Sequence, residues 1–234
     1  MTVFGKIIKR LFDIVFSLLF LICLSPIYLL TALGVVISSP GNPIYSAKRM
    51  GRGGKVFTCY KFRSMHKNSG KVHITTLRND ARIFPFGKFI RKTKIDELPQ
   101  VINILLGQMS VVGPRPEDKE IADRIYKDAY SNIMQVKPGL TSIGSLYDFT
   151  HGELFADEAE YERVFLKQKL ALELYYVENR SLWLDIKLIF RTAELILLTV
   201  FGKKNFAPPH ELEFILSVGA EGKISVSAVA NSNE

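Results

Sequence analysis

With 234 residues, the sequence has a length that fits one ordinary domain plus an attached segment. Its hydrophobic content of 47%, with 16 Phe and 9 Tyr, excludes a wholly disordered chain. The charge is unevenly divided, because residues 1–95 hold 17 basic and two acidic residues (a net charge of +15), whereas residues 96–234 carry −7. A half this basic predicts an anionic partner, which can be nucleic acid, anionic lipid or a phosphorylated substrate. Cys23 and Cys59 offer neither a metal-binding pair nor a disulfide framework.

Residues 14–37 are nearly all apolar and contain no charged side chain. At about 1.5 Å per helical residue they extend roughly 36 Å, which is enough to cross a hydrocarbon core of about 30 Å. A kinked spanning helix is therefore one interpretation. A cleaved signal peptide is disfavoured, because the apolar run is too long and no clear cleavage site follows it.

A re-entrant hairpin of helix, break and helix is the other interpretation of this segment. Ser25-Pro26 lies at its centre, and a proline removes one backbone hydrogen bond from a helix. Each half then has about the length of half a bilayer, and both flanks are basic, which places both on the cytoplasmic side. The residues alone leave the hairpin and the kinked span as equal alternatives. In either case the Ser25 hydroxyl is the nearest partner for a backbone group freed by Pro26.

Beyond residue 40 the sequence predicts an α+β domain, mainly α-helical, with a small β-hairpin. Two extended runs, residues 44–50 and 56–65, flank a glycine-rich turn and are expected to pair. Alternation along the second run places Lys61 and Arg63 on one face, which suits either phosphate binding or a solvated surface. Residues 66–82 are polar and are expected to form a loop or lid.

The remaining elements are expected to be mostly helical. We expect helices over residues 84–90, 95–106, 117–136, 156–178 and 182–200, a short buried run at 110–112 and a loop at 137–141. The second of these helices would bury Leu98, Val101, Ile102, Leu105 and Leu106 and end at Gly107. The last helix is too apolar for a free surface helix, so it is expected to lie against the core or as an amphipathic helix in a membrane interface.

Asp96-Glu97 is the first adjacent acidic pair of the chain and follows a basic stretch that includes Arg91. Acidic residues at the start of a helix commonly cap free N–H groups, which is the ordinary interpretation. Alternatively, the two carboxylates hold a divalent cation and supply a nucleophile, while Arg91 binds phosphate. The surrounding positive charge is expected to lower the pKa of Asp96.

Arg115 lies between two prolines in Gly113-Pro114-Arg115-Pro116, so its side chain projects from a stiff backbone. Such an arginine suits phosphate binding and equally suits a structural ion pair with a carboxylate. An apolar segment, a basic strand and an acidic pair together favour chemistry on a lipid phosphate. A membrane-tethered nucleic-acid binder ranks lower, because the basic residues cluster beside the apolar segment.

Five motifs follow one another in the chain: Lys9-Arg10-Leu11-Phe12-Asp13, Ser25-Pro26, Lys61-Phe62-Arg63-Ser64-Met65, Asp96-Glu97-Leu98-Pro99-Gln100 and Met109-Ser110-Val111-Val112-Gly113-Pro114-Arg115-Pro116. Together they resemble the bacterial sugar transferase family, the monotopic polyprenyl-phosphate phosphoglycosyl transferases, in its small catalytic-core form. The resemblance implies the re-entrant form of the membrane helix. An inactive membrane adaptor of the same fold is the alternative, disfavoured by the intact Asp96, Glu97 and Arg115.

The resemblance also implies a reaction. A phosphosugar would move from a nucleoside diphosphate sugar to polyprenyl (undecaprenyl) phosphate, and the expected donor is a UDP-sugar. The reaction would use Mg²⁺ and would be the first membrane step of surface-glycan synthesis. Asp96 would be the nucleophile of a covalent phosphosugar intermediate with loss of UMP, and Glu97 would share the metal site or handle a proton. Phosphate would be bound by Arg91, Arg115, Lys61 and Arg63.

The implied organisation has three parts on the cytoplasmic face of the bacterial inner membrane. Residues 1–39 would form the re-entrant hairpin, residues 40–202 the catalytic domain and residues 203–234 a peripheral tail. Anionic membrane lipids are expected partners and nucleic acid is not, while the oligomeric state, including a homodimer, is left open. Residues 142–149 depart from the family pattern, so the identity of the sugar and of the downstream glycan is also left open.

Overall fold

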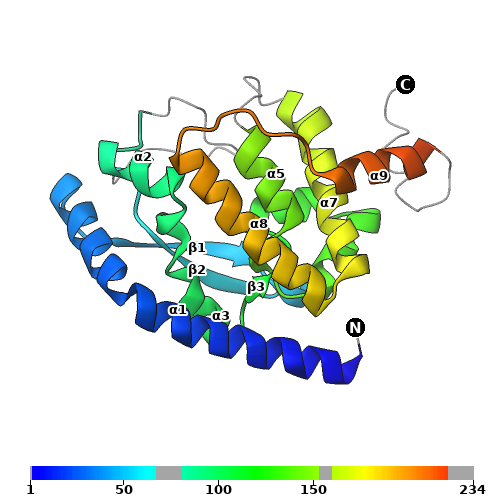
Figure 1. The fold of residues 1–234 in the computed structure, drawn as a ribbon, viewed down its shortest axis with the longest axis horizontal. Helices are drawn as coiled ribbons and strands as arrows, with labels where there is room; N and C mark the ends of the chain where they lie inside the picture. Colours follow the sequence, from blue (N-terminus) through cyan, green and yellow to red (C-terminus); the bar gives the residue numbers. More distant parts are fainter. Residues whose placement is uncertain (1, 67–80, 153–159, 221–234) are drawn as a thin grey trace.

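One helix, α1 (Val3–Ser38), contains the whole apolar segment in the computed structural model, which describes residues 2–66, 81–152 and 160–220. The helix is continuous across Ser25 and Pro26, so the predicted interruption is wrong in this detail. Figure 1 shows instead a curved helix whose C-terminal part turns away from the line of its N-terminal part. Pro26 has no N–H for the Ile22 carbonyl, and the Ser25 hydroxyl donates to that carbonyl at 2.9 Å. The predicted role of Ser25 is thus confirmed.

Most of the large apolar side chains of α1 are exposed, and among the described residues α1 is the one helix long and apolar enough to cross a membrane. Its N-terminal part is nevertheless held by polar side chains. Lys9 Nζ lies 2.5 Å from Asp185 Oδ2, and Arg10 donates to the backbone carbonyls of Ile104 and Leu105 at 2.6 and 2.8 Å. Asp13 is buried and accepts hydrogen bonds from the Ser110 hydroxyl and the Val111 N–H. The start of α1 is therefore part of the folded domain.

The predicted hairpin is confirmed, with β1 (Ile44–Met50) antiparallel to β2 (Val56–Phe62) across the turn η1 (Arg52–Gly54). Gly53 and Gly54 have φ angles of 66° and 75° in this turn, a region that favours glycine. β2 ends at Phe62, so Arg63 lies beyond the strand. The predicted loop or lid over residues 66–82 falls mainly on residues 67–80, which lie outside the described part of the chain.

The helix expected over residues 95–106 is divided into a 3₁₀ turn, η2 (Ile95–Glu97), and α3 (Gln100–Leu105), after α2 (Pro85–Lys92). The expected apolar face is partly wrong, because Ile102 and Leu106 are exposed whereas Gln100 and Asn103 are buried. Asn103 is buried because its side chain binds the hairpin, accepting from the Tyr60 N–H and donating to the Thr58 carbonyl. Gly107, with a φ of 79°, ends the helix as predicted.

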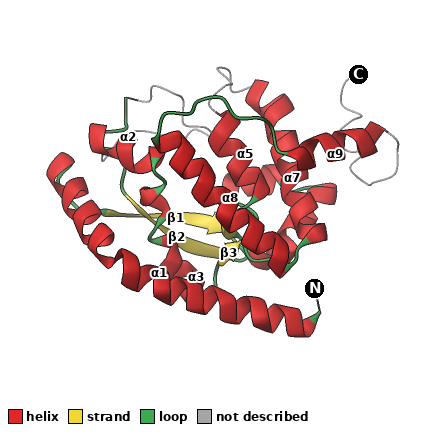
Figure 2. Ribbon diagram, viewed as in Figure 1, coloured by secondary structure: helices red, strands yellow, loops and turns green. Residues whose placement is uncertain are grey.

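Residues 137–141 are not only a loop, because β4 (Gly139–Thr141) pairs in parallel with β3 (Ser110–Val112). The strands approach closely at Gly113 and Gly139, where an added Cβ would lie within 2.6 Å of the facing backbone. The predicted helix over residues 117–136 is interrupted, since α4 (Lys119–Ile125) and η3 (Asp128–Gln135) are separate elements. Figure 2 shows the strands between α1 and the later helices.

The C-terminal helices enclose the main core. They are α5 (Ile143–His151), the π-helical η5 (Tyr161–Phe165), α7 (Leu166–Asn179), α8 (Leu182–Val200) and α9 (His210–Ala220). The bounds of α8 and its N-cap Ser181 agree with the prediction. α8 buries Leu188 but exposes Trp183 and Phe190, as expected of a helix at an interface. Residues 203–220 are not a peripheral tail, because Leu212 and Ile215 belong to the main core.

A second, smaller core lies beside the bend of α1. We call it the small core; its buried members are Val35, Phe62, Phe84 and Ile90, and Tyr28, Ala32, Ile44, Phe86, Ile95 and Leu98 pack against it. These residues come from α1, the hairpin, α2 and the segment around η2. The small core therefore joins the C-terminal part of the membrane helix to the segment that carries Asp96 and Glu97.

Candidate active site

Asp96 and Glu97 lie in η2, a single tight turn between α2 and α3. Lys94 precedes the turn in the left-handed conformation, with a φ of 59°, which costs energy in a residue other than glycine. The Glu97 and Leu98 N–H groups close the turn on the Lys94 and Ile95 carbonyls at 3.1 Å. The turn buries both acidic residues, each of which is 6% exposed.

Three cations surround the Glu97 carboxylate. Glu97 Oε1 lies 3.1 Å from Lys61 Nζ, 3.2 Å from Arg115 Nη2 and 3.8 Å from Lys94 Nζ. Burial raises the pKa of Glu97, but these cations outweigh burial and hold it well below its usual range. Glu97 is therefore the ionised centre of a cluster that β2, η2 and the Gly113–Pro116 turn assemble.

Asp96 differs from Glu97 both in its hydrogen bonds and in the direction of its pKa shift. Its Oδ1 atom is buried without a hydrogen-bond partner in the described part of the chain. Burial and the negative charge of Glu97 raise the pKa of Asp96, and they outweigh Lys61, Lys94 and Arg91. The expectation of a lowered pKa is thus wrong, because burial and the charge of Glu97 have a larger effect than the nearby cations. A buried carboxylate oxygen without a partner is costly, and this one is free to contact a ligand.

The capping interpretation of the acidic pair does not fit this geometry. The residue at the N-cap position of α3 is Pro99, and no hydrogen bond from a backbone N–H to Asp96 or Glu97 is found among the described residues. Of the two roles expected for Arg115, phosphate binding and an ion pair with a carboxylate, the structure contains the ion pair, since the guanidinium contacts Glu97.

Of the four basic residues predicted to bind phosphate, three lie around the acidic pair. Lys61 and Arg115 contact Glu97 directly, and Arg91, on α2, is near enough to lower the pKa of Asp96. Arg63 lies elsewhere: its buried guanidinium donates to the Ser39 hydroxyl and carbonyl and to the Asn42 carbonyl. It thereby binds the chain at the end of α1, because β2 has already ended at Phe62 and the alternation with Lys61 no longer applies.

A second charged cluster, which sequence reasoning missed, lies near Arg115. Lys169 on α7 is only 4% exposed, and its Nζ lies 2.9 Å from Glu117 Oε1 and 3.4 Å from Asp148 Oδ2. Asp148 also accepts a hydrogen bond from the Tyr161 hydroxyl. Both carboxyl groups have lowered pKa values: burial raises them, but Lys169 and Arg115 outweigh it. A lysine in a helix is typical of an exposed position, so the sequence does not indicate this cluster. Its partners, Glu117 and Asp148, are distant in the chain and meet Lys169 only in the fold.

Glu173 was also missed, and it supports the backbone of Arg115. Its Oε1 accepts hydrogen bonds from the Arg115 N–H at 3.1 Å and from the Ser142 hydroxyl at 2.7 Å. Burial raises the pKa of Glu173 to about 7. Ser142 begins α5 with a capping box, and Phe149 on the same helix places its ring 4.9 Å from Lys94 Nζ. The segment that departs from the family pattern therefore reaches the site.

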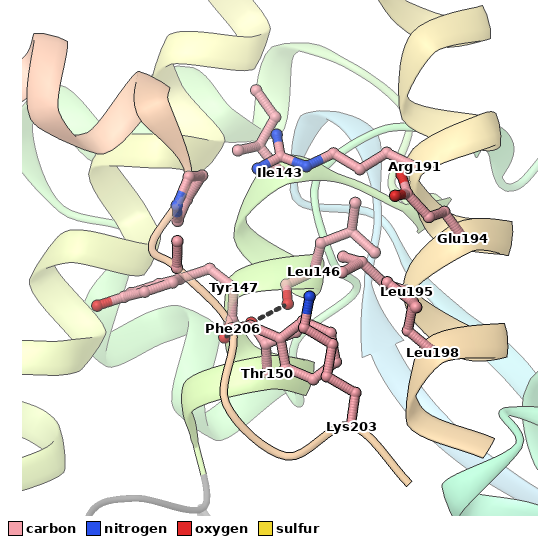
Figure 3. A pocket seen from close by; sticks show the side chains of 12 residues that line it. Ile143, Leu146, Tyr147, Thr150, Arg191, Glu194, Leu195, Leu198, Lys203 and Phe206 are labelled. Carbon is pink, nitrogen blue, oxygen red and sulfur yellow. Dashed lines mark hydrogen bonds between the residues drawn. The ribbon is translucent and has the colours of Figure 1, made fainter. Parts of the chain in front are cut away.

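A cavity of about 190 Å³ lies elsewhere, between α5, α8 and the chain that follows α8 (Figure 3). Ile143, Leu146, Arg191 and Lys203 are among its lining residues, whereas Asp96 and Glu97 are not. Arg191 is paired with Glu211 of α9 at 3.1 Å. The cavity is therefore separate from the acidic pair.

The donor set at the acidic pair fits Mg²⁺. Among the described residues no group of three or more His, Cys, Asp or Glu side chains could hold a metal. Mg²⁺ commonly takes only one or two carboxylates and completes its shell with water and phosphate oxygens. The unpartnered Asp96 Oδ1 and the adjacent Glu97 carboxylate provide that minimum.

The sequence of this chain is similar to those of known proteins. Residues 4–199 match the family model described as bacterial sugar transferase. The chain is 37% identical over 210 residues to an undecaprenyl-phosphate galactose phosphotransferase of Salmonella typhimurium, covering 82% of this chain and 41% of that protein. It is 40% identical over 197 residues to a UDP-glucose:undecaprenyl-phosphate glucose-1-phosphate transferase of Klebsiella pneumoniae, covering 80% and 40%. A protein of the same name from Caulobacter vibrioides is 34% identical over 196 residues, covering 82% and 70%. The chain thus spans about two fifths of the length of the first two relatives.

Proposed function

This chain belongs to the bacterial sugar transferase family, and from that membership we propose that it transfers a phosphosugar from a UDP-sugar to undecaprenyl phosphate. The observation that carries the proposal is the contrast within the acidic pair. Glu97 is ionised and surrounded by three cations, while the neighbouring Asp96 keeps a buried oxygen without a partner. Such a site can bind a diphosphate and present a carboxylate to phosphorus.

We propose two successive displacements at the phosphorus that carries the sugar. First, an Asp96 carboxylate oxygen forms a bond to that phosphorus. The bond between this phosphorus and the oxygen that bridges the two phosphates of the UDP-sugar breaks, and UMP leaves with the electron pair. Second, a phosphate oxygen of undecaprenyl phosphate attacks the same phosphorus. The bond to Asp96 then breaks, which restores the carboxylate and yields the diphosphate-linked lipid sugar.

The basic residues have separate tasks in this reaction. Lys61, Lys94 and Arg115 neutralise Glu97 in the structure, and their remaining donors would bind the diphosphate. Arg91 would add charge on the α2 side of Asp96. Mg²⁺ held by Asp96 and Glu97 would supply positive charge to the phosphate oxygens of the leaving group. Arg63 takes no part in binding the diphosphate, since Ser39 and Asn42 engage its guanidinium.

We propose further that α1 enters and leaves one leaflet of the membrane. The contacts of Asp13 with Ser110 and of Arg63 with Ser39 hold both ends of the helix on the same folded domain. A spanning helix would require this one domain to lie on both sides of a hydrocarbon core about 30 Å thick. The basic flanks favour the cytoplasmic side for the domain, and anionic lipids would contact them. The exposed apolar side chains of α8 would lie in the interface.

The test of the reaction uses the full chain in nanodiscs with undecaprenyl phosphate, Mg²⁺ and a panel of UDP-sugars. We expect release of UMP with at least one sugar, and we expect Asp96→Asn to abolish it, because the amide keeps the shape but is no nucleophile. Glu120→Gln, at an exposed position on α4, is the control and should retain the activity. Release of no UMP from any sugar would favour the inactive adaptor.

A further inference from the structure

Tyr28 is the residue where the bend of α1 meets the turn that carries the acidic pair. It follows Pro26 by two positions, and its hydroxyl donates a hydrogen bond to the Leu98 carbonyl at 2.5 Å. Leu98 directly follows Glu97. We propose that Tyr28 is a positioning residue that couples the course of the membrane helix to the orientation of Asp96 and Glu97. This inference rests on the proposed function and deepens it.

The Leu98 carbonyl is a sensitive point of the site. It accepts hydrogen bonds from two donors, the Tyr28 hydroxyl and the Val101 N–H at 3.0 Å. It therefore joins η2 to the first turn of α3. Loss of the tyrosine donor leaves the Val101 N–H as the remaining donor to this carbonyl among the described residues, and Lys94, which precedes the turn, is already in a strained conformation.

The ring of Tyr28 also contacts β2, the strand that bears Lys61. It packs edge-on against Phe62, with the ring centroids 5.8 Å apart and the planes at 61°. Phe62 is the neighbour of Lys61, whose ammonium group pairs with Glu97. One side chain thus touches both the turn that bears Glu97 and the strand that bears its partner.

The remaining contacts of this part of α1 are apolar. Ala32 and Val35 lie four and seven residues after Tyr28, on the same side of the helix, and pack in the small core. Among the described residues, the Tyr28 hydroxyl makes the one side-chain hydrogen bond between α1 beyond Pro26 and the segment from η2 to α3. Apolar contacts are non-directional, whereas a hydrogen bond fixes a distance and a direction. Tyr28 therefore fixes Asp96 relative to the helix that lies in the membrane.

The consequence concerns turnover more than substrate binding. Catalysis requires the nucleophile within a fraction of an ångström of its attacking position, and a displacement of about 1 Å can cost roughly a hundredfold in rate. Of the cations that would bind the diphosphate, Lys61 stands on β2 and Arg115 on the turn near Gly113, and loss of the Tyr28 hydroxyl alone leaves the Tyr28 ring packed against Phe62. A change at Tyr28 should therefore lower kcat and leave the KM for the UDP-sugar nearly unchanged.

Tyr28→Phe is the variant that tests this, because it removes only the hydroxyl and keeps the ring against Phe62. Tyr130→Phe is the matched control: it removes the hydroxyl of a partly buried tyrosine on η3, an element that carries neither the acidic pair nor any of its cations. Both would be measured in nanodiscs for kcat, for KM and for amide hydrogen exchange of peptides covering residues 95–101. We expect Tyr28→Phe to lower kcat about tenfold with KM within twofold, and to speed exchange at these residues alone. Tyr130→Phe should match the wild type in all three.

The inference is overturned if Tyr28→Phe keeps the wild-type kcat, if exchange at residues 95–101 is unchanged, or if exchange rises equally in α7, which would mean general destabilisation. Failure of the proposed function is a separate result, namely a wild-type chain that releases no UMP. In that case the exchange measurement alone decides whether Tyr28 holds the turn.

Discussion

The guanidinium of Arg115 lies 3.2 Å from the Glu97 carboxylate, and this contact joins the Gly113–Pro116 turn to the turn that carries Asp96. Lys61 and Lys94 complete the neutralisation of Glu97. The site therefore divides two adjacent carboxylates into different states: Glu97 is engaged with cations, and Asp96 is left with an oxygen that has no partner. This division supports Asp96, not Glu97, as the nucleophile.

Arg115→Lys should weaken catalysis although the charge is kept. Lysine lacks the planar fork that contacts Glu97 and that would bind a phosphate at the same time, so we expect a loss of roughly 1–3 kcal/mol, about 5–150-fold in kcat/KM. Arg52→Lys, at an exposed arginine of η1 that binds the Gln135 carbonyl, is the control and should be neutral. An Arg115→Lys enzyme as active as the wild type would show that Arg115 acts only through its charge.

Glu173→Gln should change how stability depends on pH. Because burial raises the pKa of Glu173 to about 7 from 4.5, the folded state holds a proton that the unfolded state releases between these values. Its stabilising contribution is complete below about pH 4.5 and is lost as the pH rises through about 7, a change of roughly 3 kcal/mol. Glutamine does not titrate, so the variant should not lose this contribution. When thermal unfolding is measured at pH 5 and pH 8, the stability of the variant relative to the wild type should be higher at pH 8 than at pH 5. Unfolding temperatures that change equally with pH in both proteins would contradict the prediction.

Gly34→Ala should loosen the contact between α1 and α2. A Cβ at Gly34 would lie 2.6 Å from two atoms of the Phe86 ring, which is too close for any side chain to accept without moving. We expect a destabilisation of roughly 1–3 kcal/mol, reduced by about 1 kcal/mol because alanine favours the helix. Thermal unfolding measures it, and adding Phe86→Leu should restore part of the loss. A Gly34→Ala protein more stable than the wild type would mean that the helices are free to separate.

The topology of α1 can be measured with single cysteines at Thr2 and Lys48 after replacement of Cys23 and Cys59. Because both ends of the helix are fastened to one domain, both sites should be protected from an impermeant thiol reagent added to intact cells. Pro26→Leu restores the missing backbone donor for Ile22 and should straighten the helix, so that Thr2 competes to appear outside. External labelling of Thr2 in the native protein would establish an ordinary span.

The parts of the fold that follow from the sequence have local causes. Alternation predicts the hairpin around Gly53, and a long apolar run with a capping serine predicts α8. The strand β4 has only three residues, too few for a period, and depends on the approach of Gly113 to Gly139. At Pro26 the residues alone left a continuous kinked helix and an interrupted one as equal alternatives, and the structure has the continuous helix, with the Ser25 hydroxyl bonded to Ile22 as expected.

Within the site, sequence reasoning found the residues that stand in motifs and missed those that act from a distance. Lys61 and Arg115 were expected near phosphate, and both lie against Glu97. Lys169 and Glu173 are charged residues inside a helix, and their burial is explained only by partners on other elements. The direction of the Asp96 pKa shift depends in the same way on the fold, since burial and the charge of Glu97 outweigh the cations around it.

The central claim, that Asp96 carries the phosphosugar, is tested most directly by the mass of the intact protein after incubation with a UDP-sugar and Mg²⁺ in the absence of undecaprenyl phosphate. We predict that the wild type gains one phosphosugar, that peptide mapping places it on Asp96, and that adding undecaprenyl phosphate removes it. Asp96→Asn should gain nothing. A wild-type enzyme that transfers sugar but never gains the mass, or a gain that persists in Asp96→Asn, would contradict the account.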